Sequence, residues 1–584
     1  MKRNKYIGLT MMAAAMFAAT SCTDFRDYNE APADAVSSGN QTLWENIQGN
    51  SQLSQFAALL KRTKFDEQLS ASRSYTVWAP LDGTFDYEAY NAMSDSLLLQ
   101  QFVKSHIAEF SHGASGAVNE RVHTLNEKSF TFQGDGTYTF DGVSISKPNQ
   151  PSTNGLMHLM DGAATFHPNL FEYVAEGGRF NMLRDYVMQY NDTTLSSESV
   201  KGPIVDGVQT YLDSVLVVTN TLLRNRLGAR IENEDSSYTF IIPTDEAYQK
   251  LYDKVKSRYN FISSTVVQQP QEFSSASATN SVTVTTNATY LSDSLTRSTI
   301  ARNLIYSNND AYNQWVVGKG PETDTLRSTT RYKLSNPDEL LNKYLAEEPI
   351  ALSNGYARLV DSVAYLPWET YTPEYEINPR YYLMNLFGGS SHSQSINDPS
   401  SVVFGKESGI TEFRYLWIEP GGGYSKPDFF IGLPGVMSTT YNFYVVMLPT
   451  AWNVFGGETR PNKLNFQLNY CQANGKTANY NFSKAYADSL KTGGKLPTVP
   501  TSVNMNTAFE NDPTKTDTIF IGRFTFPVCY NGLGSDYMPY IRVTSPINVF
   551  LPTQMAAYSR DVRMAFILMT PVEYDEFKAN NNKK

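Results

Sequence analysis

The sequence predicts a multidomain protein, in which two related α+β units are followed by an all-β domain. Three observations indicate this: the chain has 584 residues, one phrase occurs twice in its first half, and its last third consists of short β-prone runs separated by Gly, Pro and Asn. At roughly 150 residues per domain, the length predicts about three or four domains. The hydrophobic content of 41% is enough for several cores.

The first 21 residues predict a secretory signal and not a part of the fold. Three basic residues lie within the first five positions, and the apolar run over residues 7–19 is too short to span a bilayer. The letters ATSC, which end at Cys22, resemble a bacterial lipobox, and the resemblance implies that Cys22 is lipidated. An ordinary signal peptide that ends near a Cys is the alternative.

Residues 22–41 are acidic and rich in small residues, which indicates a flexible tether. An acidic stretch directly after the lipidated Cys resembles the surface-export signal of Bacteroidota lipoproteins, although a plain polar linker has the same composition. No later run is long and apolar enough to span a membrane. We therefore expect a lipid-anchored protein of the outer membrane that faces the cell exterior.

The repeated phrase reads YTVWAPLDGTF at Tyr75–Phe85 and YTFIIPTDEAY at Tyr238–Tyr248. Each copy predicts a short strand that must end, or lie at a sheet edge, at its Pro, which lacks a backbone donor. Asp82 and Asp245 then take the same place, and we expect each to cap the helix or turn that follows. A catalytic or metal-binding role is the alternative, but neither Asp has a partner at ligand spacing.

Three further blocks recur in the same order around this phrase. Upstream, apolar residues at helical spacing predict an amphipathic helix in each copy, with Phe56 and Leu59 matching Leu183 and Tyr186. Downstream come two more pairs: LLLQQFVKSHIAEF with STIARNLIYSNNDAY, and the closing phrases NGLMHLMDG with NGYARLVDS. The spacing predicts two insertions of about 36 residues in the second copy, the earlier one helical in pattern over residues 208–228 and the later one rich in Ser, Thr, Asn and Val.

This set of blocks resembles the fasciclin domain. The resemblance covers residues 42–167 and 168–370, which implies two tandem fasciclin-like domains and a role in adhesion and protein interaction. The family's Tyr-His or similar pair is represented by Ser105-His106 in the first copy and by Ser307-Asn308 in the second. For His106 we favour a structural role, hydrogen-bonded within the domain, over that of a ligand.

Residues 378–584 predict a β-sandwich, and their sequence does not identify a family for it. Six β-prone runs, bounded by turn residues, carry the prediction: 413–418, 440–449, 463–471, 517–527, 539–546 and 561–571.

A Gly-rich turn within this region, EPGGGYSKPDFF, is flanked by aromatic residues. Trp417, Tyr424, Phe429 and Trp452 are therefore candidate binding residues, because aromatic rings beside a loop can stack on sugars or anchor a protein interface. Core packing and hairpin chemistry explain the same residues, and we favour that interpretation.

Enzymatic chemistry is not predicted. The sequence has no G-x-S-x-G, H-E-x-x-H, G-x-G-x-x-G or P-loop motif, and its six His residues lack ligand spacing, so we expect no enzyme, no cofactor and no metal site. A paired carboxylate for glycoside hydrolysis needs only spatial proximity and stays open. The formal charge of −10 does not indicate the basic surface that binds nucleic acid, so we expect no nucleic-acid partner. Cys471 and Cys529 are either a disulfide or two buried thiols.

Two hypotheses of function follow. The first is a non-enzymatic surface lipoprotein for adhesion or protein binding, with an accessory role beside an outer-membrane nutrient importer. The second is a surface lipoprotein that binds or cleaves glycans through its C-terminal β-sandwich.

Overall fold

The computed structural model describes residues 39–581, apart from 196–199, 206, 214–215, 263–264, 271–278, 285–286, 387–390, 398–413, 494–496 and 531–537. Cys22 and residues 22–38 of the expected tether lie outside this part. The described residues form two compact units, of which the first contains residues 39–176, 230–238 and 350–356 and the second the remainder. We refer to residues 42–167 as the first repeat and to residues 168–370 as the second repeat.

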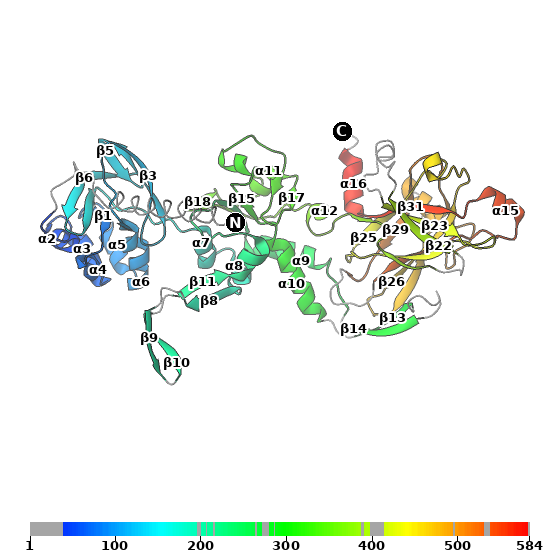
Figure 1. Cartoon of the computed structure of the whole chain (residues 1–584), viewed down its shortest axis with the longest axis horizontal. Helices are drawn as coiled ribbons and strands as arrows, with labels where there is room; N and C mark the ends of the chain where they lie inside the picture. The colour runs from blue at the N-terminus through cyan, green and yellow to red at the C-terminus, as the bar shows by residue number, and fades with distance from the viewer. Residues whose placement is uncertain are drawn as a thin grey trace, which may run out of the picture. The chain divides into compact units, whose positions relative to one another are not determined.

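The first repeat is built on a seven-stranded sheet in the order β2-β1-β7-β6-β5-β4-β3, blue to cyan in Figure 1. β1 pairs parallel with β7 and antiparallel with β2. The strands are β1 (Tyr75–Pro80), β2 (Ile107–Glu109), β3 (Ala117–His123), β4 (Ser129–Asp135), β5 (Thr137–Phe140), β6 (Val143–Ser152) and β7 (Gly155–Met160). The helices are α2 (Leu43–Gly49), α3 (Ser54–Arg62), α4 (Asp66–Ser70), α5 (Tyr87–Ala92) and α6 (Asp95–Leu98).

The two amphipathic helices are confirmed. α3 buries Phe56, Leu59 and Leu60 against the strand residues Val77 and Ala79, and the core of the first repeat forms there. In the second repeat α8 (Asn181–Met188) buries Leu183, Tyr186 and Val187. Both phrase strands end at their Pro, as the missing backbone donor requires.

The repeated Asp caps a different helix from the one expected. Asp82 accepts hydrogen bonds from the backbone N–H groups of Ser54 and Gln55, at 3.0 and 2.8 Å, so it caps α3, which precedes it in the chain. Asp245 accepts one from the backbone N–H of Met182 at 2.7 Å and caps α8 in the same way. The helices that follow are capped locally, α5 by Asp86 and α9 (Asp245–Lys256) by Thr244. The expectation of a cap on the following helix was wrong because the carboxylates reach back across the fold to free N–H groups.

The Asn of the closing phrase makes a second set of hydrogen bonds that both repeats share. Asn154 accepts a hydrogen bond from the backbone N–H of Leu43 and donates to two carbonyls, those of Leu69 and Ala71. Asn354 repeats the pattern, accepting from Leu170 and donating to Ile231 and Asn233. Each buried amide thus joins three separated backbone segments.

A glycine is required after each Asn because the backbone of a neighbouring strand lies very close to it. Gly155 and Gly355 have φ of +152° and +147°. An added Cβ would lie 2.0 Å from the Tyr75 carbonyl oxygen in one case and 1.9 Å from that of Tyr238 in the other. Only a residue without Cβ fits at either position.

The second repeat contains a four-stranded sheet in the order β15-β12-β19-β18 and a group of helices, green in Figure 1. Its helices are α7 (Leu170–Glu176), α8, α9, α10 (Ala288–Ala301), α11 (Pro337–Leu341) and α12 (Pro367–Thr370). Its strands are β8 (Asn191–Leu195), β9 (Val200–Val205), β10 (Val208–Asp213), β11 (Leu216–Asn220), β12 (Tyr238–Pro243), β13 (Thr265–Pro270), β14 (Thr279–Val284), β15 (Ile305–Ser307), β16 (Leu326–Arg327), β17 (Lys333–Leu334), β18 (Ile350–Leu352) and β19 (Gly355–Val360).

The helical expectation for residues 208–228 was largely wrong. β10 and β11 occupy about half of these positions, and among the described ones the helical segment is Leu222–Leu227. β11 pairs antiparallel with β8, and β10 with β9. The run is rich in Val and Thr, whose branched side chains favour strands, and its apolar residues fit both periods.

In the structure, the third blocks of the two repeats align in a different register from the one expected from the sequence. β2 begins at Ile107 and β15 at Ile305, and the Thr76 hydroxyl donates to the Phe110 carbonyl where that of Thr239 donates to the Asn308 side chain. Asn308 therefore corresponds to Phe110, and the position of His106 is taken by Leu304. The pairing of Ser307-Asn308 with Ser105-His106 was out by four residues, because short blocks without intervening anchors align ambiguously.

The C-terminal region contains two six-stranded sheets, and all six expected strands are confirmed. In one sheet the order is β22-β23-β31-β25-β29 with β20 beside β31, and in the other β21-β24-β30-β26-β27 with β28 beside β26 (Figure 1). The first sheet comprises β20 (Tyr375–Ile377), β22 (Ser391–Asn397), β23 (Arg414–Pro420), β25 (Thr440–Met447), β29 (Asp517–Thr525) and β31 (Val562–Pro571). The second comprises β21 (Leu383–Leu386), β24 (Asp428–Gly432), β26 (Lys463–Cys471), β27 (Thr477–Asn481), β28 (Phe509–Glu510) and β30 (Tyr540–Thr544), and the helices of the region are α14 (Lys484–Thr492), α15 (Pro552–Ala557) and α16 (Val572–Asn581).

Aromatic side chains from the two sheets meet between them. Phe443 on β25 lies 5.1 Å from Phe482, and Phe524 on β29 lies 4.6 Å from Tyr470 on β26, measured between ring centroids. Cys471 and Cys529 are both buried and both free, so the alternative of two thiols holds. Burial raises the pKa of Cys471 to about 11 and also raises that of Cys529, which disfavours a reactive thiolate at either position.

Candidate functional site

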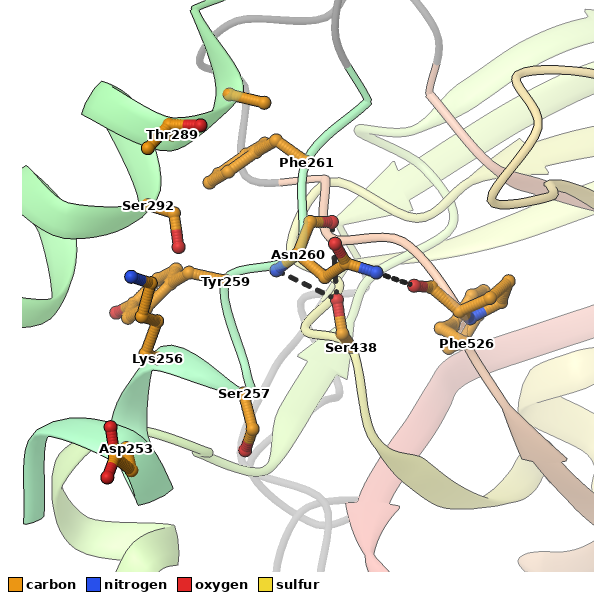
Figure 2. Close-up of a pocket in the computed structure, with 12 residues that line it drawn as sticks. Asp253, Lys256, Ser257, Tyr259, Asn260, Phe261, Thr289, Ser292, Ser438 and Phe526 are labelled. Carbon is orange, nitrogen blue, oxygen red and sulfur yellow. Dashed lines mark hydrogen bonds between the residues drawn. The ribbon is translucent and has the colours of Figure 1, made fainter. Parts of the chain in front are cut away.

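The second unit contains a hollow of about 660 Å³ beside α9 and α10 (Figure 2). Side chains from both helices line it, together with Asn260, Phe261 and residues of the C-terminal region such as Ser438 and Phe526. Its polar groups come from single, scattered residues and form no nucleophile with an adjacent base. The hollow has the size of a ligand pocket but not the convergent chemistry of a catalytic one.

Asn260 fixes one side of this hollow. Its side-chain amide donates to the Pro527 carbonyl at 2.7 Å, and its backbone N–H donates to the Ser438 hydroxyl at 3.2 Å, as Figure 2 shows. Two residues earlier, Arg258 donates to the Glu573 carboxylate at 2.9 Å. These hydrogen bonds connect the chain after α9 with three separate segments of the C-terminal region, which indicates a structural joint.

Two of the four candidate aromatic residues pack together in one cluster. Trp417 and Trp452 are half-buried against a group of apolar side chains that includes Phe455. The guanidinium of Arg563 lies 4.1 Å above the Trp417 ring, and the Trp452 indole donates to the Thr514 carbonyl at 3.0 Å. Both rings have internal partners, so the packing interpretation fits them.

Phe429 cannot serve a ligand. It points into the core from β24 and is fully buried. Its place as a candidate binding residue is therefore corrected to a core position, because β24 lies inside its sheet between β21 and β30 and is buried from Phe429 to Gly432.

Tyr424 is the candidate that remains accessible. It is 70% exposed on the Gly-rich turn and stacks on Phe550, itself 74% exposed, with ring centroids 5.1 Å apart and planes 25° from parallel. Arg560 holds the turn by donating to the carbonyls of Gly422 and Gly423, each at 3.0 Å, and of Ser425. The pair is thus an exposed aromatic surface on a fixed turn, which we name the Tyr424–Phe550 surface.

Phe550 was missed in the sequence. It lies in the run PINVFLP, where an aromatic residue between two Pro residues and outside any strand period signals an exposed loop position. Its partnership with Tyr424 has no local signal, because 126 positions separate the two residues.

Two histidines of the first repeat, His106 and His158, are structural. His106 is fully buried; its Nδ1 lies 2.7 Å from the Phe102 carbonyl, and its Nε2 accepts from the Ala164 backbone at 2.9 Å. His158 is equally buried, and Trp78 stacks on it at 5.6 Å. Burial lowers the pKa of each to about 4, so both rings are neutral at pH 7.

Metal-binding clusters and membrane-spanning helices are both absent from the described part of the chain. No cluster of three or more His, Cys, Asp or Glu side chains able to hold a metal ion occurs there. Among the same residues, no helix has both the length and the apolar character that crossing a bilayer requires.

The first repeat is thus an α+β domain in which a helix is capped from across the fold and an Asn-Gly pair joins the sheet to the helices. Residues 51–164 match the family model of the fasciclin domain, and the chain therefore contains a fasciclin domain. No curated protein matches the sequence.

Solved structures give distant similarities. A fasciclin domain pair from the insect cell adhesion molecule fasciclin I is 11% identical, with 55% of this chain and 99% of that chain covered and a TM-score of 0.20. A xylanase 10B fragment from Clostridium thermocellum is 8% identical over 34% of this chain and 29% of that one, at a TM-score of 0.19. A xanthan lyase from Paenibacillus is 11% identical over 38% and 16%, at a TM-score of 0.18.

Proposed function

We propose that this chain is a non-enzymatic lipoprotein of the cell surface that acts in adhesion or protein binding. The fasciclin domain supports the class, because such domains are found in cell-adhesion proteins. In this proposal Cys22 carries the lipid, residues 22–41 form the tether, and the protein faces the exterior from the outer membrane.

The finer architecture belongs to the same proposal. Residues 168–370 form a second fasciclin-like domain, which the shared Asp caps and Asn-Gly pairs support. Residues 378–584 form a β-sandwich, which the aromatic contacts between the two sheets support.

The observation that carries the binding role is the Tyr424–Phe550 surface. Two large exposed rings, stacked on a turn that Arg560 fixes, lose little conformational entropy when a partner covers them. We propose that this surface contacts another surface protein, with an outer-membrane importer as the partner of an accessory subunit.

Purification of the full-length lipoprotein from outer membranes in mild detergent tests this. We expect a partner in stoichiometric amount, and we expect the double variant Y424A/F550A to lose it at least tenfold, since hot-spot aromatics contribute about 2 kcal/mol or more each. Tyr356→Ala, at another exposed Tyr, is the matched control. Recovery of the wild-type protein alone would count against the accessory role.

The same rings could stack on a sugar, which keeps the glycan hypothesis as the second candidate. It predicts that the purified full chain binds a polysaccharide without any partner protein, and that Y424A/F550A abolishes this binding. Cleavage of the polysaccharide would in addition contradict the non-enzymatic part of the proposal.

A further inference from the structure

The groove between α8 and α10 of the second repeat differs from the corresponding groove between α3 and α6 of the first repeat, although the positions that border the two grooves correspond. The sequence SDSL occurs at Ser94–Leu97 and again at Ser292–Leu295, so Asp95 corresponds to Asp293. On the facing helix Leu59 corresponds to Tyr186, so the residue that corresponds to Arg62 is Gln189.

In the first repeat Arg62 fills the groove. Its Nε donates to the Asp95 carboxylate at 2.9 Å, and its Nη1 donates to the Asn91 carbonyl at 2.6 Å. The guanidinium therefore bridges α3 to the start of α6.

In the second repeat the bridge is missing, because Gln189 is shorter and uncharged. A pocket of about 300 Å³ takes its place, within the range of small-ligand sites. Eight residues line it: Asp185, Tyr186, Gln189, Tyr190, Tyr290, Asp293, Ser294 and Arg297. The pocket lies entirely within the second unit.

A buried polar atom at this pocket has no structural explanation. Tyr186 is 3% exposed, and no described residue meets its hydroxyl in good hydrogen-bond geometry, although the Tyr190 side chain lies beside it. The corresponding residue in the first repeat is Leu59, so the fold does not require an oxygen here. A buried, unsatisfied hydroxyl is costly, and a ligand that hydrogen-bonds it would remove the cost.

The charges of the pocket are already balanced. Arg297 donates to the Asp293 carboxylate at 3.0 Å, and Arg184 donates to Asp185 at 2.7 Å. Burial by itself would raise the pKa of Asp293, but hydrogen bonds from Tyr252 and Arg297 outweigh it and lower that pKa. No unpaired charge thus calls for an ionic ligand, whereas the carboxylates keep free lone pairs for hydroxyl donors.

The aromatic rings complete the pattern. Tyr190 stands at 82° to Tyr186, with centroids 5.6 Å apart, and Tyr290 is 69% exposed at the rim. Rings for the apolar face of a ligand, with carboxylate, amide and hydroxyl groups for its polar edge, match the two faces of a pyranose.

We propose that this pocket binds one neutral sugar residue. The ring of the sugar stacks on Tyr190 and Tyr290, its hydroxyls donate to Asp185 and Asp293, and one of them pairs with the Tyr186 hydroxyl. The site is independent of the Tyr424–Phe550 surface and of the function proposed for it.

Saturation-transfer NMR on the full chain tests this, with a panel of five neutral sugars (glucose, galactose, mannose, xylose and N-acetylglucosamine) and with glucuronate and glucosamine as charged comparisons. We expect at least one sugar to bind with a millimolar dissociation constant, on the order of 4 kcal/mol of binding free energy. Gln189→Arg should restore the bridge to Asp293 and weaken binding at least tenfold. Arg62→Gln, the reciprocal change in the first repeat, is the matched control and should leave binding unchanged.

Tyr186→Phe separates ligand binding from structure. It removes only the hydroxyl beside Tyr190, so we expect a melting temperature close to that of the wild type, together with a threefold to tenfold weaker sugar affinity. Failure of all five sugars to bind would overturn the proposal. So would binding that survives both Gln189→Arg and Tyr186→Phe, or a preference for glucuronate or glucosamine over every neutral sugar.

Discussion

The two repeats keep the same backbone hydrogen bonds but differ in what fills the spaces between their elements. In both, an Asp after the phrase strand caps a helix that lies earlier in the chain, and an Asn joins three backbone segments. The groove beside that helix holds a guanidinium in one repeat and a pocket in the other. The comparison teaches that unpaired backbone groups constrain the fold strictly, whereas side chains facing a groove can change and create a site.

The repeats also differ in their buried polar groups. His106 and His158 are buried in the first repeat, where the second has Leu304 and Arg358. The second repeat contains no His.

The largest effect is expected where the repeats agree most closely. Gly155→Ala and Gly355→Ala should each destabilise their own repeat by about 4 kcal/mol or more, because the new Cβ would meet a strand carbonyl and the left-handed φ would be strained. Hydrogen exchange at the flanking strands measures the loss repeat by repeat. Gly49→Ala, where an added Cβ meets nothing within 4 Å, is the control.

The two Gly variants also test the equivalence of the repeats. If Gly355→Ala left protection of β12 and β19 unchanged while Gly155→Ala unfolded the first repeat, the closing phrases would not be equivalent. The proposal of a second fasciclin-like domain would then lose its main structural support.

A lower pH should destabilise the first repeat more than the second. Burial lowers the pKa of His106 and His158 to about 4, below the ordinary value of 6.5, so between these values the unfolded chain binds more protons than the folded one. The stability that the two neutral rings contribute is complete above pH 6.5 and is lost as the pH falls toward 4. The slope is about 1.4 kcal/mol per pH unit for each ring.

Urea titration at pH 7.0 and 5.5, read by pulse proteolysis that resolves fragments of the two repeats, measures this difference. We expect the midpoint of the first repeat to fall and that of the second to change much less. Equal acid sensitivity in both repeats would show that these two rings do not decide the response.

The sequence supports part of this account and not the rest, for identifiable physical reasons. Helical spacing in α3 and α8 and the Pro at the end of each phrase strand act locally, and these predictions were confirmed. The target of Asp82 was wrong because its partners, Ser54 and Gln55, lie 27 or 28 positions away and the carboxylate has no local marker for them. Burial of Phe429 and exposure of Tyr424 were equally hidden, since both are aromatic residues beside one turn.

The pocket of the second repeat was not predicted. Its residues come from two helices that are about 100 positions apart in the chain, and each residue alone is typical of a helix surface. A signal was present in the exchange of Arg62 for Gln189 beside the repeated phrase SDSL. It becomes readable only when the fold shows that the two positions face each other.

Removal of the long-range caps should have an intermediate effect in both repeats, somewhat larger for Asp82, which caps two backbone N–H groups, than for Asp245, which caps one. Asp82→Ala and Asp245→Ala each free N–H groups at a helix N-terminus, and we expect a loss of about 1–2 kcal/mol in either case. Chemical denaturation followed by the same fragment-resolved proteolysis measures it. Asp86→Ala, which removes the local cap of α5, is the comparison, and an unchanged stability after Asp82→Ala would contradict the long-range assignment.

The smallest effect is expected from Arg62→Gln, which copies the second repeat into the first. The ion pair with Asp95 is largely exposed, with side chains 30% and 71% accessible, so its loss should cost less than about 1 kcal/mol. The variant should nevertheless open a groove beside α3, which a crystal structure would show. Because Leu59 lacks the hydroxyl of Tyr186 and Leu99 replaces Arg297, we expect the opened groove to bind none of the five sugars. Sugar binding there would mean that an open groove suffices, and that the tyrosine hydroxyl and the balanced charges of the second repeat do not determine recognition.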